Sequence, residues 1–190
     1  MRQTAILTTL ITAAAACTVS AQTTIQIPRI VNQRQPSTAA KPSANLGNAA
    51  FSYVGTPSLR RQALESYLAR IARKSPSRAK MLSADFARND ADKLYQSLIA
   101  NTGLQNYDVA DALTAYNLTG WIIANGVKTV PPRSQIVAAR RQTAIILAKN
   151  PTMANAGTRG RAGEEFKLMT VTLHFGLLSA RRSGDSKAYA

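Results

Sequence analysis

The stretch YDVADALTAYNLTGWIIANG, residues 107–126, carries a broad apolar stripe at helical spacing. The stripe consists of Val109, Ala112, Leu113, Tyr116, Gly120 and Ile123. Further apolar residues extend it almost all the way round, so we predict a helix over 107–124 and expect it to be the most buried helix. Asn125 and Gly126 follow as a pair that is typical of a helix C-cap.

Helices with start and stop signals are predicted on both sides of this stretch. Thr56-Pro57, Ser75-Pro76 and Pro131-Pro132 mark starts, and Gly103 marks a stop. Asn89-Asp90 interrupts the second helix and supplies a new N-cap. The predicted ranges are 57–74, 76–101 in two pieces, 131–149 and 164–182, with a loop over 152–163.

No strand pattern competes in this part of the chain, so the predicted fold class is all-α. Helices joined by short loops pack as antiparallel neighbours. We therefore predict a compact bundle of about four main helices plus a split second helix, preceded by a disordered leader. The predicted organisation is a signal peptide at 1–21, a flexible Pro/Ser/Thr/Gln-rich leader at 22–50, a helical domain at 51–184 and a frayed tail at 185–190.

The first residues have the three parts of a secretory signal: Arg2, an alanine-rich apolar run at 5–16 and the small residues before Gln22. We expect cleavage between Ala21 and Gln22 and a periplasmic or secreted protein. A lipoprotein anchored at Cys17 is the alternative, because Cys17 follows a degenerate lipobox. No later segment has the length and hydropathy of a membrane span.

The chain is strongly basic, with 24 Lys and Arg against 9 Asp and Glu and a net charge of +15. Such a charge attracts anionic surfaces, including an anionic envelope component and, non-specifically, nucleic acid. Cys17, the only cysteine, lies in the segment that we expect to be cleaved off, and His174 is the only histidine, so we expect no cysteine nucleophile, no metal site and no cofactor in the mature protein. The candidate anion-binding residues are Arg60, Arg61, Arg140, Arg141, Arg159 and Arg161.

Asp108 and Asp111 are the first candidates for chemistry, because an i, i+3 spacing puts both carboxylates on one helix face. Paired carboxylates can act as acid and base or hold a cation. The structural alternative is that Asp108 stabilises the helix dipole and Asp111 pairs with Arg140 or Arg61.

The glycine-rich run at 157–163 is the second candidate, since its backbone and its two arginines suit a phosphate. The run lacks the Gly-Lys-Ser/Thr ending of a Walker loop, so a mobile surface loop is the alternative. His174 has no partner at i±4 that would suggest metal chemistry, and we expect it to be a packed side chain.

A family resemblance rests on Gly103-Leu104, the run at 108–116, Trp121 and Asn125-Gly126. These residues resemble the shared segment of a family of exported bacterial proteins catalogued as a domain of unknown function. The resemblance spans roughly 51–182 and implies a helical exported domain, with no activity attached. The matching motif positions are Asp108, Asp111, Tyr116, Trp121, Asn125 and Gly126.

Three hypotheses for function remain open at this point. The first is a non-enzymatic module that binds an anionic envelope component through arginine-rich helix faces. The second is an assembly module that contacts another exported protein through the leader at 22–31. The third is an enzyme centred on Asp108 and Asp111, for which Asp111 should lie in an open pocket with a shifted pKa rather than in a closed ion pair.

Overall fold

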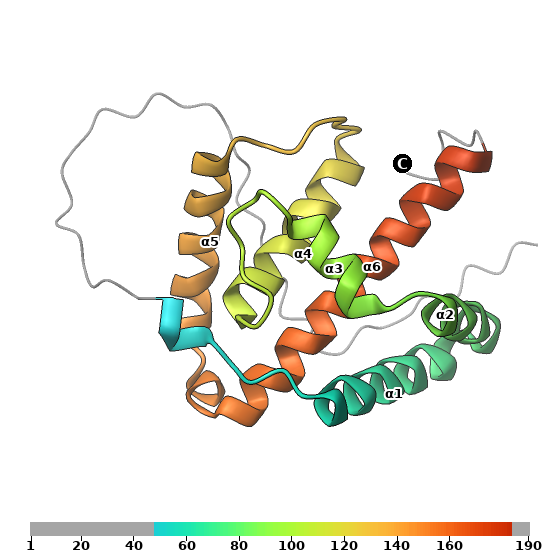
Figure 1. The fold of residues 1–190 in the computed structure, drawn as a ribbon, viewed down its shortest axis with the longest axis horizontal. Coiled ribbons are helices and arrows are strands. Elements are labelled where there is room, and N and C mark those ends of the chain that lie inside the picture. The colour runs from blue at the N-terminus through green and yellow to red at the C-terminus, as the bar shows by residue number, and fades with distance from the viewer. Residues whose placement is uncertain (1–47, 184–190) are drawn as a thin grey trace, which may run out of the picture. The chain divides into compact units, whose positions relative to one another are not determined.

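The computed structural model describes residues 48–183, which form six α-helices (Figure 1). The helices are α1 (Pro57–Lys74), α2 (Pro76–Arg88), α3 (Ala91–Ile99), α4 (Val109–Ala124), α5 (Arg133–Ala148) and α6 (Ala156–Ser183), with short 3-10 helices η1 (Asn48–Phe51) and η2 (Pro151–Ala154). These residues contain no strand, only one isolated bridge between Ser52 and Asp108. The all-α class is confirmed; the predicted signal peptide, nearly all of the leader and the tail lie outside the described residues.

Side-chain caps begin several helices where the sequence predicted them. Thr56 accepts a hydrogen bond from the Leu59 backbone N–H at 3.1 Å, and Ser75 accepts one from Arg78. Asp90 caps α3, so the predicted second helix is indeed split. Gly126 has a φ of +60° after the end of α4, a conformation that glycine adopts without strain.

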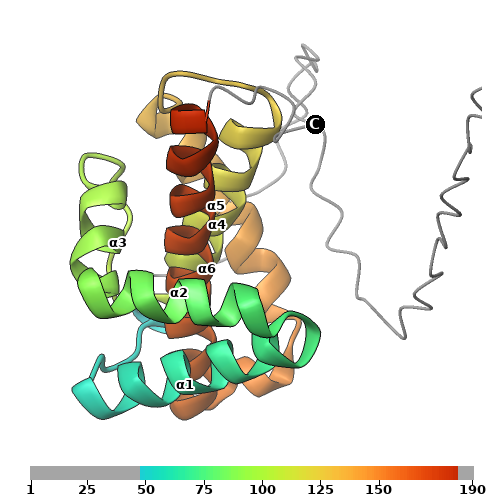
Figure 2. The same ribbon diagram turned by 90° about the vertical axis from the view of Figure 1, so that its right-hand side faces the viewer.

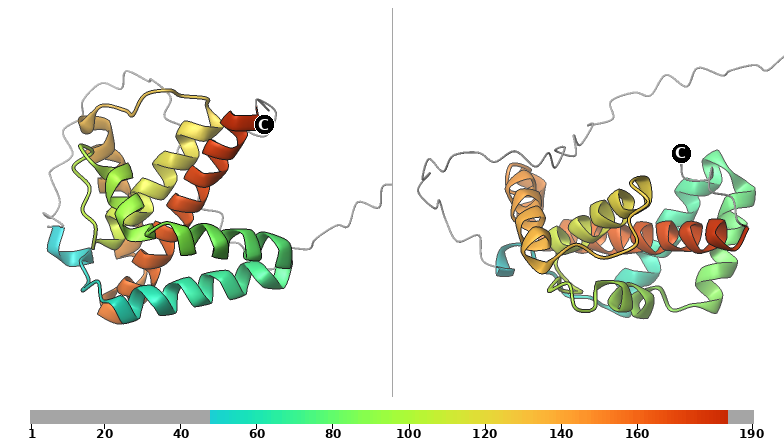
Figure 3. Two further views of the ribbon diagram at one scale, coloured as in Figure 1. Left: turned by 45° about the vertical axis from the view of Figure 1, so that its right-hand side comes forward. Right: turned by 90° about the horizontal axis from the view of Figure 1, so that it is seen from above.

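Helix α6 is the central element of the described domain and contacts α1, α3 and α4 (Figures 1 and 2). Helices α1 and α2 pair with each other across one half of α6, and Figure 3 shows them as a hairpin from a third direction. Helix α5 packs beside α4 at the edge of the domain. This order places α4 and α6 between the α1–α2 pair and α5.

Two apolar clusters make up the core. One joins α1, α2, α3, α4 and α6 and contains Ala63, Tyr67, Leu82, Phe86, Tyr95, Ile99, Ala115, Leu168 and Val171. The other joins η1, α4 and α5 and contains Phe51, Val109, Ala110, Leu113, Ala144 and Leu147. Among residues 48–183 we find no helix with both the length and the hydropathy needed to cross a membrane.

Helix α4 is the most buried helix of the described domain, as expected, but its burial is confined to its first half. Every residue from Val109 to Ala115 is buried, whereas the residues from Tyr116 onward are half-buried or exposed. The difference arises because the last turns of α4 project, together with those of α6, past α1 and α2 (Figure 1). Its apolar composition alone does not show where neighbouring helices end.

The predicted loop at 152–163 is wrong, because this stretch is helical. Helix α6 begins at Ala156 instead of Glu164, and Asn155 Oδ1 caps it by accepting from the Thr158 N–H at 2.9 Å. Glycine in a helix costs about 1 kcal/mol relative to alanine, which is why the run suggested a loop. Here Gly163 lies against the Tyr53 ring too closely for a larger residue, and Gly160 lies against a methyl group of Leu59, so tertiary packing outweighs the local preference.

Candidate functional site

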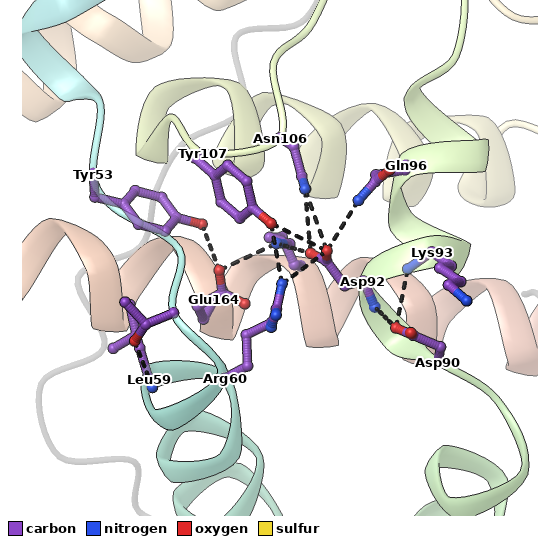
Figure 4. A network of polar contacts seen from close by, with 12 residues as sticks. Tyr53, Leu59, Arg60, Asp90, Asp92, Lys93, Gln96, Asn106, Tyr107 and Glu164 are labelled. Atoms are coloured by element: carbon purple, nitrogen blue, oxygen red, sulfur yellow. Dashed lines mark hydrogen bonds and ion pairs between the residues drawn. The ribbon is translucent and has the colours of Figure 1, made fainter.

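A polar network within the described domain centres on the carboxylate of Asp92, at the start of α3 (Figure 4). Its donors are Arg60 Nη1 at 3.1 Å, Gln96 Nε2 at 2.9 Å, the Tyr107 hydroxyl at 3.2 Å, Asn106 Nδ2 at 3.3 Å and Lys167 Nζ. These donors come from α1, α3, α6 and the segment before α4. One carboxylate therefore connects, through hydrogen bonds, elements that are far apart in the sequence.

Lys167 is the cation at the inner side of this network, and its side chain is only 3% exposed. Its ammonium group pairs with Asp92 and, at 3.1 Å, with Glu164 one turn earlier on α6. It also lies 4.7 Å from the centre of the Tyr107 ring, in a cation–π contact. A buried ammonium group needs such partners, because leaving water without compensation is very unfavourable.

Tyr53, which lies in the segment before α1, is the last member of the network. Its hydroxyl donates to Glu164 Oε1 at 3.0 Å, and its ring meets Tyr107 edge-on at 5.9 Å. Gly163 makes this approach possible, because a Cβ at that position would lie 2.7 Å from Tyr53 Cζ. The glycine-rich start of α6 thus has a packing function in this site.

Burial and charge set the protonation of the network. Burial opposes ionisation of Asp92, but the hydrogen bond and charge of Lys167, aided by Asn106 and Arg60, outweigh it and hold the pKa of Asp92 below its ordinary value. Burial, then the neighbouring Glu164 carboxylate, raise the pKa of Tyr53 far above its usual range. Asp92 is therefore an ionised acceptor and Tyr53 a protonated donor, which matches their hydrogen bonds.

A cavity of about 240 Å³ lies next to the network, between α1, the α2–α3 junction and α6. Arg60, Arg61, Asp92, Glu164 and Lys167 contribute to its wall, which is otherwise formed largely by apolar side chains such as Leu64 and Phe86. Each buried charge at this wall is bonded to an opposite charge. The arrangement suits a cross-link between helices better than acid–base catalysis, because Asp92 is a weak base whose oxygens already accept several hydrogen bonds.

Asp108 and Asp111 form a second buried cluster with Arg140. Arg140 Nε donates to Asp111 Oδ1 at 2.5 Å, and Arg140 Nη2 to Asp108 Oδ2 at 3.4 Å. Asp108 also caps α4 by accepting from the N–H groups of Ala110 and Asp111, and Asp111 accepts from the Gln105 N–H at 2.7 Å. Burial raises the pKa of Asp108 above its ordinary value, against the opposing effect of those backbone donors and Arg140.

The geometry of this second cluster agrees with the structural alternative. Asp111 is 2% exposed and forms a closed ion pair with Arg140, one of the two partners that the sequence suggested. An acid or base that acts on a substrate needs access to it, which this position does not offer. The pair links α4 to α5 and explains the i, i+3 spacing without catalysis.

The predicted anion-binding arginines divide into two groups. Arg60 and Arg140 belong to the two clusters, and Arg159 donates to the backbone carbonyls of Ser52, Met153 and Ala154. Arg61, Arg141 and Arg161 are exposed and form no ion pair with another described residue. Only this second group has its charge directed outward.

The remaining predicted residues have structural surroundings. Tyr116 stacks on Phe166 with ring centres 6.3 Å apart, and Asn125 donates to the carbonyl oxygen of half-buried Trp121 at 2.8 Å. Burial, and to a lesser extent Arg181, lower the pKa of His174. Within residues 48–183, no group of three or more His, Cys, Asp or Glu side chains is close enough to hold a metal ion.

The sequence did not reveal the first network: Arg60 was a candidate only for anion binding, and Tyr53, Asp92 and Lys167 were not candidates. Asp92 follows an N-cap in a short helix, and Lys167 is a single lysine in an amphipathic one, so each has the local pattern of a surface residue. One signal was available: Lys167 lies four residues before Val171 and therefore on the apolar side of its helix. Pairing it with Asp92 requires the tertiary fold.

The comparisons with known proteins identify no relative. No family model matches the chain, and neither a curated protein nor a solved structure matches it. The resemblance to an exported bacterial family therefore stays a prediction.

Proposed function

We propose that this protein is an exported helical module that binds an anionic component of the cell envelope and does not catalyse a reaction. Export rests on the signal-like sequence at 1–21, which lies outside the described residues. Binding rests on the way the described domain distributes its charge. The proposal deepens the hypothesis that composition alone suggested.

The observation that carries the proposal is that four of the described acidic groups are buried in ion pairs, whereas most of the described basic groups lie at the surface. Asp92, Asp108, Asp111 and Glu164 are all largely buried and bonded to cations of the protein itself. The chain has far fewer acidic than basic residues, so few carboxylates are left to neutralise the surface. The field outside the domain is therefore positive, which draws anionic partners toward it.

The two alternatives have less support. An enzyme centred on Asp108 and Asp111 would need these carboxylates to be accessible, and Arg140 engages both. An assembly module would act through residues 22–31, which lie outside the described residues, so no observation here favours it.

Binding of the purified protein to dextran sulfate, lipopolysaccharide and anionic vesicles, with uncharged dextran as control, tests the proposal. We expect binding to all three anions at physiological salt, about 0.15 M, and weaker binding as salt screens the charges. Replacing Arg61, Arg141 and Arg161 together with Gln should weaken binding without unfolding the protein, because their side chains are exposed. Absence of binding to every anion at physiological salt would refute the proposal.

A further inference from the structure

Helix α5 has an outer side that no other described helix covers. Its inner side packs on α4 and η2 through Ile136, Thr143, Ala144 and Leu147, and Figures 1 and 3 both show α5 at the edge of the domain. The opposite side consists of Val137, Ala138, Arg141, Gln142, Ile145, Ile146 and Lys149, all exposed, which we call the outer α5 face. The described structure therefore leaves one side of α5 in solvent.

Branched aliphatic side chains on this face are unusually open to water. Val137 is 48% exposed, Ile145 47% and Ile146 44%, on a helix whose inner side is well packed. Single exposed aliphatic residues are ordinary, but these three all lie on the side of α5 that is open to solvent. Such a group favours a partner that removes it from water.

Cations alternate with these aliphatic residues. Val137, Arg141, Ile145 and Lys149 follow each other at i, i+4 spacing, so basic and apolar side chains share one stripe. The sequence contains no Asp or Glu between Asp111 and Glu164, so no carboxylate of α5 or its flanking loops offsets this charge. The stripe is complementary to a surface that is both anionic and apolar.

We infer that the outer α5 face docks on the surface of an anionic phospholipid bilayer. A helix lying in the membrane interface places aliphatic side chains at the boundary between headgroups and acyl chains, while Lys and Arg contact anionic headgroups. This inference rests on the proposed function and names its partner: a soluble polyanion would use the cations alone, whereas a bilayer uses the aliphatic side chains as well.

Vesicle binding of the full chain tests the inference. We compare phosphatidylcholine vesicles containing phosphatidylglycerol with phosphatidylcholine vesicles, and use dextran sulfate as the soluble polyanion. The double variant Ile145→Ser/Ile146→Ser should weaken binding to the anionic vesicles about tenfold and leave dextran sulfate binding unchanged. Arg141→Gln should weaken vesicle binding about fivefold.

Matched controls lie on other helices. Met81→Ser removes an apolar side chain that is 63% exposed on α2, and Arg73→Gln removes an exposed arginine of α1. Both should change vesicle binding less than twofold. Far-UV circular dichroism of each variant shows whether its helices are retained.

A second measurement locates the contact directly. Ile145→Trp in a Trp121→Phe background places one tryptophan on the outer α5 face, and Met81→Trp in the same background places it on α2. Brominated lipids should quench the tryptophan at position 145 strongly and the one at position 81 weakly.

The outcomes separate the inference from the proposed function. The docking inference would be wrong if the protein bound dextran sulfate but the Ser double variant bound vesicles as well as the wild type does. Equal quenching of the tryptophans at positions 145 and 81 would overturn it as well. Either result would leave the proposed anion binding intact. Loss of binding to every anion would overturn both. If a second copy of the chain or a protein partner covers the outer α5 face instead, vesicle binding should also be unchanged in these variants, and the docking inference would be overturned.

Discussion

Removing the ammonium group of Lys167 should strongly destabilise the domain. Lys167→Met keeps a similar aliphatic stem but leaves Asp92 and Glu164, whose side chains are 11% and 5% exposed, without their shared cation. Asp92 retains Arg60 as a partner, whereas Glu164 keeps only the Tyr53 hydroxyl. Removing one partner of a buried ion pair typically costs about 3–5 kcal/mol, and we expect a loss in that range.

Urea unfolding followed by circular dichroism at 222 nm measures this loss. With a slope of roughly 2 kcal/mol per molar urea, the midpoint should fall by about 2 M. Lys93→Met is the matched control, because Lys93 is an exposed lysine of α3, and its change should stay within about 0.5 kcal/mol. Adding Glu164→Gln to Lys167→Met removes the unpaired charge and should restore roughly 1–3 kcal/mol.

A loss below about 1 kcal/mol for Lys167→Met would refute the reasoning, because exposed ion pairs contribute only that much. Equal losses for Lys167→Met and Lys93→Met would do the same. Additivity of Lys167→Met and Glu164→Gln would show that the two side chains do not interact.

Three further outcomes follow from the same contacts. Gly163→Ala should lower the free energy of unfolding by about 1–3 kcal/mol, because the added methyl group clashes with Tyr53. At Gly176 an added Cβ meets nothing within 4 Å, so Gly176→Ala should raise the free energy of unfolding by up to about 1 kcal/mol. Thermal or urea unfolding measures both changes. The folded pKa of Asp92 lies below its unfolded value of about 3.9, so the stabilisation from its ionised form is complete above that pH and is lost as pH falls through the folded pKa. The difference in free energy of unfolding between wild type and Asp92→Asn, measured by urea unfolding at pH 7 and at pH 2–3, should therefore be smaller in acid. A constant difference would contradict the pairing. The buried Tyr95 hydroxyl has no hydrogen-bond partner among the described residues, so Tyr95→Phe should leave the free energy of unfolding unchanged or increase it. A loss above about 1 kcal/mol would show that the hydroxyl does have a partner.

The sequence by itself determined the helices and most of their ends. Apolar periodicity is a local property of each segment, and caps such as Thr56, Ser75 and Asp90 act within a single turn. For the same reason the ion pair of Asp111 with Arg140 could be suggested in advance: both residues lie beside the apolar stripes of helices expected to be neighbours.

Only the tertiary structure decided where α6 begins and which charges are buried. Gly160 and Gly163 weaken a helix locally, yet Gly163 is required where the Tyr53 ring approaches, and that requirement comes from a segment about a hundred residues earlier in the chain. Lys167 and Asp92 likewise resemble solvent-exposed residues until α3 and α6 pack together. Local propensity depends on neighbours in sequence, whereas close approach and desolvation depend on neighbours in space, and these are known only once the helices have packed.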